Sequence, residues 1–135
     1  MKKHLLQAAE RGDAEAQFNL AIMYQNGLDD SRYAVEGNRA EAMRWLLAAA
    51  EQGLSSAQIR LAEIYAGEPE IPDSAVKACG WYLLAAANLR GAHLQNAQSA
   101  YRRVSIRLTS AQDAEVRRFV QGWKPTAPTL AAMVR

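Results

Sequence analysis

The sequence has almost no cysteine and no long hydrophobic run. A single cysteine among 135 residues, Cys79, excludes an internal disulfide framework and a multi-cysteine metal site. Its place in a helical, apolar stretch beside Trp81 predicts a small buried side chain rather than a reactive thiol. No apolar stretch approaches the roughly 18 residues that a membrane span needs. We therefore expect a cytoplasmic protein that does not enter a membrane.

Signatures of catalysis are missing as well. The sequence contains no GxSxG nucleophile elbow, no P-loop and no dinucleotide-binding glycine pattern. His4 and His93 lie far apart in the chain, and neither stands at a metal-ligand spacing. The acidic groups near Asp29 and Glu68 lack the oxygen spacing of a calcium loop. The expectation is a protein that is not an enzyme and holds no cofactor and no metal, with a hydrolase as the alternative from another class.

The composition is that of a folded domain, with an uneven distribution of charge. Hydrophobic residues make up 50% of the chain and charged residues 22%, with 4 prolines. Residues 1–89 hold eight Lys and Arg against twelve Asp and Glu, whereas residues 90–135 hold eight against two. Such asymmetry indicates an electrostatic partner or a head-to-tail contact between copies.

A repeat with a period of 41 residues dominates the sequence. The segment 9–17 returns as segment 50–58, and Gly12 to Gly53 and Tyr24 to Tyr65 have this same separation of 41. Self-similarity at a period of about 20 to 50 residues marks a solenoid, in which each unit buries its apolar face against its neighbours.

Alanine-rich segments with apolar residues at helical spacing predict an all-α fold. Glycine is expected to end helices by taking the left-handed conformation, at positions 12, 27, 53, 67 and 91. The expected helices cover about 2–11, 13–26, 38–52, 54–66, 73–90, 93–108 and 110–122. Residues 109–112 match a capping box at the start of the last helix.

Small and large side chains alternate as close helix packing requires. Leu20 and Tyr24 share one face of a helix beside small alanines, and the partner helix places Trp45 between two alanines. The expected core positions are Ala16, Leu20, Ala21, Tyr24, Ala42, Trp45 and Ala49 in the first unit, and Leu61, Ala62, Tyr65, Ala78, Trp81 and Ala85 in the second.

This joint spacing of Ala, Leu, Tyr, Trp and Gly resembles the Sel-one-like repeat, a helical-hairpin relative of the tetratricopeptide repeat. The residues that carry the resemblance in the first copy are Gly12, Ala14, Ala16, Gln17, Leu20, Ala21, Tyr24, Gly27, Ala42, Trp45, Ala49, Ala50 and Gly53. The second copy matches through Ala57, Gln58, Leu61, Ala62, Tyr65, Gly67, Ala78, Trp81, Tyr82, Ala85 and Ala86. The segment from Leu108 to Trp123 is similar to the closing segment of bacterial members.

The resemblance implies an α/α solenoid of about two and a half hairpins with a C-terminal cap. The expected divisions are a partial repeat 1–12, repeats 13–53 and 54–91, a capping hairpin 92–123 and a tail 124–135. The loop after Gly27 is longer than usual, and the third unit is offset because two extra residues separate Trp81 from Gly91. His4 falls at a Trp position, which predicts an open first hairpin.

By the same resemblance, the protein is a scaffold or adaptor that gathers other proteins, as in bacterial signalling, secretion or membrane-protein quality control. The first helix of each unit is expected to line the concave face and to bind a peptide or protein. Whether neighbouring helices instead cover Phe18, Ile22 and Ile59 is left open. The expected binding residues are Glu15, Phe18, Ile22, Gln25, Asn26, Ser56, Ile59, Glu63, Arg103 and Arg107.

Two further surfaces carry open alternatives. An arginine cluster near the C-terminus fits an acidic protein or phosphates, or is the solvated cap of a solenoid, and we expect no nucleic acid there. The apolar tail residues 130–134 dock on this chain or a neighbour, or form a frayed terminus. The arginine cluster consists of Arg102, Arg103, Arg107, Arg117 and Arg118.

Self-assembly into a homo-oligomer through the open first hairpin is the second hypothesis for function.

Overall fold

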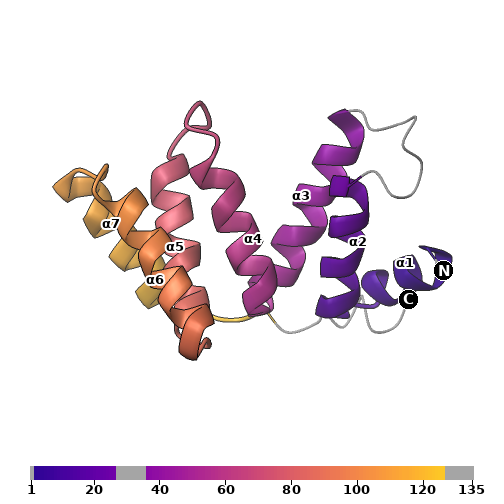
Figure 1. Cartoon of the computed structure of the whole chain (residues 1–135). Helices are drawn as coiled ribbons and strands as arrows, with labels where there is room; N and C mark the ends of the chain where they lie inside the picture. The colour runs from indigo at the N-terminus through magenta and orange to yellow at the C-terminus, as the bar shows by residue number, and fades with distance from the viewer. Residues whose placement is uncertain (1, 27–35, 127–135) are drawn as a thin grey trace. The chain divides into compact units, whose positions relative to one another are not determined.

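The computed structural model describes residues 2–26 and 36–126, and it describes only the backbone of Lys2, Asn26 and residues 36–38. All regular secondary structure in these ranges is α-helical (Figure 1). The all-α prediction is confirmed, and every predicted helix overlaps an observed one. The helices are α1 (Lys2–Glu10), α2 (Ala14–Asn26), α3 (Glu36–Glu51), α4 (Ser55–Ala66), α5 (Ser74–Ala86), α6 (Gly91–Ser105) and α7 (Ser110–Gly122).

Two helix ends repeat the same backbone geometry 41 residues apart. Gly12 has a φ of 101° and Gly53 a φ of 98°, both in the left-handed region where a Cβ is costly. The N–H of Gly12 donates to the Ala9 carbonyl at 3.0 Å, and the N–H of Gly53 donates to the Ala50 carbonyl at 3.0 Å. The prediction that glycine ends these helices is confirmed at both positions.

Two other glycines bear out only part of the prediction: α4 does end at Ala66, directly before Gly67, but the predicted conformation is wrong there, and at Gly91 the predicted helix end is wrong. Gly67 does not take a positive φ, because the chain leaves α4 through a tightened turn in which the Glu68 N–H donates to the Tyr65 carbonyl at 3.2 Å. Gly91 has a φ of 58° but is the first residue of α6, not the end of α5. Helix α5 already ends at Ala86, where similar short-range bonds close its last turn. Gly27 lies outside the described residues.

The chain divides into two compact units, which are described separately. The N-terminal unit comprises Met1–Ala57 with Pro125–Arg135, and the C-terminal unit comprises Gln58–Lys124. In the N-terminal unit α2 packs against both α1 and α3. Its core confirms the predicted spacing, since Leu20, Ala21 and Ala49 are fully buried and Trp45 is 6% exposed, while Tyr24 is half-buried.

A buried glutamine joins three segments of the N-terminal unit. The side-chain nitrogen of Gln17 donates to the Ala9 carbonyl at the end of α1, at 3.0 Å. The side-chain oxygen of Gln17 accepts from the Gln52 amide just after α3, at 2.9 Å. Gln17 is 6% exposed, so both bonds satisfy polar atoms that would otherwise be costly to bury. The repeated Ala-Gln dipeptide thus has a structural role in this unit.

In the C-terminal unit α5 is the central helix and packs against α6 and α7. Ala78, Cys79 and Ala85 are fully buried, which confirms the predicted environment of the cysteine. The ring of Trp81, 5% exposed, meets the ring of Phe119 edge to face with centroids 5.5 Å apart. This contact fixes α7 against α5.

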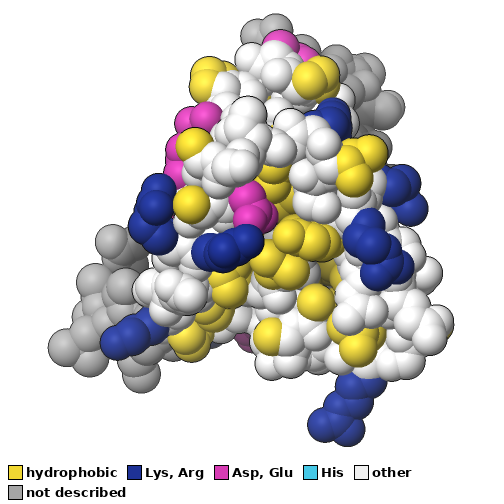
Figure 2. Space-filling model, turned by 90° about the vertical axis from the view of Figure 1, so that its left-hand side faces the viewer, with side chains coloured by type: hydrophobic (Ala, Val, Ile, Leu, Met, Phe, Trp, Pro, Cys, Tyr) yellow, Lys and Arg dark blue, Asp and Glu magenta, His cyan; other side chains and the backbone are white. Residues whose placement is uncertain are grey.

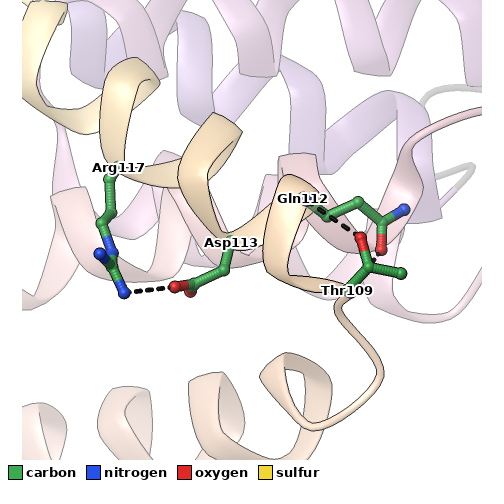
Figure 3. Close-up of polar contacts among 4 residues, drawn as sticks. All are labelled: Thr109, Gln112, Asp113 and Arg117. Atoms are coloured by element: carbon green, nitrogen blue, oxygen red, sulfur yellow. Dashed lines mark hydrogen bonds and ion pairs between the residues drawn. The ribbon is translucent and has the colours of Figure 1, made fainter.

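Helix α7 begins at the predicted capping box, drawn in Figure 3. The Thr109 hydroxyl accepts from the Gln112 N–H at 3.1 Å, and the Gln112 side-chain oxygen accepts from the Thr109 N–H at 2.9 Å. One turn further on, Arg117 forms an ion pair with Asp113 (Figure 3). The reciprocal cap satisfies two backbone donors that a helix start leaves without partners.

Candidate partner-binding surfaces

The predicted binding residues of α2 lie beside its packing row in the N-terminal unit. Phe18 and Ile22 are half-buried, and Glu15 and Gln25 are exposed. Neighbouring side chains therefore cover part of each apolar side chain and leave part of it accessible. Four apart on one helix, Phe18 and Ile22 present one apolar strip between polar groups. The side chain of Asn26, also predicted here, lies outside the described residues.

Helix α4 carries three predicted residues across the boundary between the units. Ser56, in the N-terminal unit, is exposed. Ile59, in the C-terminal unit, is half-buried, and Glu63, one turn later, is exposed. Neither Ser56 nor Glu63 donates or accepts a side-chain hydrogen bond with another described residue.

Within the C-terminal unit, a buried tyrosine connects two of the predicted residues. Burial raises the pKa of the Tyr82 phenol, the carboxylate of Glu63 raises it further, and the guanidinium of Arg103 opposes that rise. Tyr82 is 5% exposed, so its ring belongs to the core, while its hydroxyl group lies within electrostatic range of both charges. Charges on α4 and α6 thus both act on one residue of α5.

Arg103 and Arg107 each lie within electrostatic range of a residue of α5. Arg103 acts on Tyr82, and Arg107 acts on Cys79, which precedes Tyr82 by about one helical turn. Both arginines are exposed, and in the described part of the chain neither forms an ion pair. Glu63, Arg103 and Arg107 thus all belong to the C-terminal unit.

A family model for the Sel1 repeat matches residues 14–54 and 55–88, more than half of the chain. The chain belongs to the Sel1 repeat family. This confirms the resemblance to Sel-one-like repeats, whose fold is a solenoid of helical hairpins. No curated protein and no solved structure matches the chain.

Each Sel1 repeat corresponds to one helical pair of the structure. The first match covers α2 and α3, and the second covers α4 and α5 and ends at residue 88. Helices α6 and α7 lie beyond both matches. Sel1 repeats generally mediate protein–protein interaction and form a non-catalytic scaffold family. Arg103 and Arg107 therefore stand on a hairpin that the Sel1 model does not cover.

One residue near these arginines was missed in the sequence analysis as part of a surface. Ile106, directly after α6, is 83% exposed. An isolated aliphatic residue between arginines was the available signal. Figure 2 views the side on which α7 lies in Figure 1, and it shows hydrophobic side chains gathered among Lys and Arg side chains.

The remaining candidates give no further site. His4 and His93 are both exposed. Across residues 2–26 and 36–126, no three His, Cys, Asp or Glu side chains gather as metal ligands. None of the helices described combines the length and the apolar character needed to cross a membrane.

The first residues of the C-terminal tail contact the N-terminal unit. The N–H of Thr126 donates to the carbonyl of Glu51, the last residue of α3, at 2.7 Å. The apolar tail residues 130–134, for which docking and fraying were both left open, lie outside the described residues, as does the long loop after Gly27.

Proposed function

We propose that this Sel1 repeat protein is a scaffold or adaptor that binds a peptide or protein through the first helix of each repeat, α2 and α4. The observation that carries the proposal is the half-buried pair Phe18 and Ile22, which forms an apolar strip flanked by exposed Glu15 and Gln25. Apolar anchors within a polar rim are the usual anatomy of a peptide-binding surface. A second proposed surface lies in the C-terminal unit and consists of Ile59, Glu63, Arg103 and Arg107.

The half-burial of the α2 strip supports binding because it reconciles two needs. A fully covered strip would have nothing to offer a partner, and a fully exposed one would be a solubility liability. Partial cover holds Phe18 and Ile22 in place before binding, so that less conformational entropy is lost when a partner arrives.

The proposal is tested by substituting both Phe18 and Ile22 with Glu. Capture of the partners that the unaltered protein binds from the native cell should fall by about tenfold or more. The reason is that an apolar anchor covered by the partner becomes an uncompensated charge. The control is Leu47→Glu on α3, which makes the same chemical change at a side chain that is 38% exposed. Both variants should keep the helical circular dichroism spectrum.

Three outcomes decide the test. Loss of partners in the α2 variant with retention in Leu47→Glu supports the proposal. Equal capture by both variants contradicts it. A salt-sensitive change of molar mass in light scattering, with no other protein captured, would favour self-assembly, which the uneven charge of the chain supports.

A further inference from the structure

The end of α6 presents an exposed aliphatic side chain among unpaired arginines. Ile106 is 83% exposed and keeps helical dihedrals, with a φ of −64° and a ψ of −15°. It therefore follows Arg102 by four positions and Arg103 by three on the same helical surface, with Arg107 directly after it. All three arginines are exposed.

The positive charge at this place finds no ion-pair partner among the residues that the structure describes. Arg102 contacts the hydroxyl of Ser99 at 3.4 Å, and among described residues none of the three arginines pairs with a carboxylate. The nearby Asp113 is already paired with Arg117. A net positive field therefore reaches solvent around Ile106.

Helix electrostatics explain only part of this arrangement. Basic side chains in the last turn of a helix interact favourably with its dipole, which accounts for Arg102 and Arg103. The dipole does not account for an isoleucine left in water one residue past the helix. Among the described residues, the other exposed large apolar side chains are Leu47 and Phe119, and each is only 38% exposed.

We propose that Arg102, Arg103, Ile106 and Arg107 form a docking surface for an acidic protein segment that carries an aliphatic anchor. The carboxylates of that segment pair with the guanidinium groups, and its apolar side chain covers Ile106. A protein segment fits better than a nucleic acid, because bases stack on aromatic rings and an isoleucine offers none. The inference rests on the proposed function in that Arg103 and Arg107 belong to the same proposed binding surface.

The probe is a fluorescein-labelled synthetic peptide of about 12 residues, rich in Glu with one central Leu, measured by fluorescence anisotropy. Matched peptides replace every Glu by Gln, or the Leu by Ser. The peptide that keeps both its Glu residues and its Leu should bind most tightly. Its affinity should fall several-fold between about 50 mM and about 300 mM salt, because salt screens exposed charges. Either matched peptide should bind more weakly.

The variants separate this surface from general charge. Arg103→Glu with Arg107→Glu should weaken binding by about tenfold or more, and Ile106→Asp should also weaken it, because each removes a contact and adds repulsion. Arg90→Glu is the control for charge, because Arg90 is exposed and caps the other end of α6, roughly 20 Å away at 1.5 Å per residue. Ile106→Val should bind as the unaltered protein does.

Each result decides the inference. Loss in the arginine and Ile106→Asp variants with retention in Arg90→Glu supports it. No binding of the acidic peptide, equal loss in Arg90→Glu, or tighter binding of a single-stranded oligonucleotide than of the peptide overturns it. The double variant Phe18→Glu with Ile22→Glu should still bind the acidic peptide, so failure of the α2 surface and failure of this one give different results.

Discussion

Gly80 positions the ring of Phe119 by having no side chain of its own. A Cβ built at Gly80 would lie 2.6 Å from one ring carbon of Phe119 and 2.8 Å from the next, closer than carbon atoms pack. We expect Gly80→Ala to lower the free energy of unfolding by about 1–3 kcal/mol, because the ring must leave its contact with Trp81. Urea unfolding followed by circular dichroism measures this difference.

The same substitution should change sign when the ring is removed. In a Phe119→Ala background no ring obstructs the new methyl group, and Gly80→Ala should then stabilise the chain by about 1 kcal/mol through helix propensity. Gly122→Ala is a matched control, since nothing lies within 4 Å of a Cβ at that glycine. Equal effects of Gly80→Ala with and without Phe119 would contradict the role given to the ring.

Residue spacing was enough to predict the core but not the binding surface. Leu20, Trp45 and Leu61 are buried because their spacing keeps them on the packing face of a helix, and that face is a local property. The exposure of Phe18 and Ile22 depends on how far neighbouring helices overhang them, which spacing does not specify. Half-burial was therefore visible only in the folded structure.

At the scale of the element, the capping box should contribute measurably to the stability of α7. Thr109→Ala removes the hydroxyl that accepts from the Gln112 N–H and should cost about 1 kcal/mol in urea unfolding. Thr109→Ser keeps a hydroxyl and should stay close to the unaltered protein. A Thr109→Ala midpoint equal to that of Thr109→Ser would show that this cap is not needed for the helix start.

Helix ends could be predicted from the sequence where the repeat fixed them. Gly12 and Gly53 occupy equivalent positions of a period, and both take the left-handed conformation. Gly67 and Gly91 follow stretches that depart from the period, and there the backbone closed the preceding helix by short-range carbonyl bonds instead. A lone glycine marks a break in a helix but does not specify how the break is made.

At the scale of the whole molecule, the two proposed binding surfaces lie on different parts of the chain. The repeats supply the α2 strip, which is apolar, and the last hairpin supplies arginines and Ile106, which favour an acidic segment. The second proposed surface draws on the charge imbalance of the sequence, which has eight Lys and Arg against two Asp and Glu after residue 89. Because the two surfaces differ in chemistry, salt should weaken binding at the arginines more than at the α2 strip.

Global stability should fall in alkaline solution, because burial holds protons on four groups. Burial raises the pKa of the Cys79 thiol from 9.0 to about 11, and it also raises the pKa of the Tyr65, Tyr82 and Tyr101 phenols. Between about pH 9 and pH 11 the unfolded chain therefore loses a proton that folded Cys79 retains. The stability that these groups provide is fully present below about pH 9 and is lost as the pH rises through their folded pKa values.

Urea unfolding at a series of pH values from about 8 to about 11 tests this expectation, with the midpoint falling steadily above pH 9. Cys79→Ala removes one of the four groups, so its midpoint should fall less steeply than that of the unaltered protein, whatever the substitution does to stability at pH 8. Identical slopes for the two chains would show that burial does not hold the proton on Cys79.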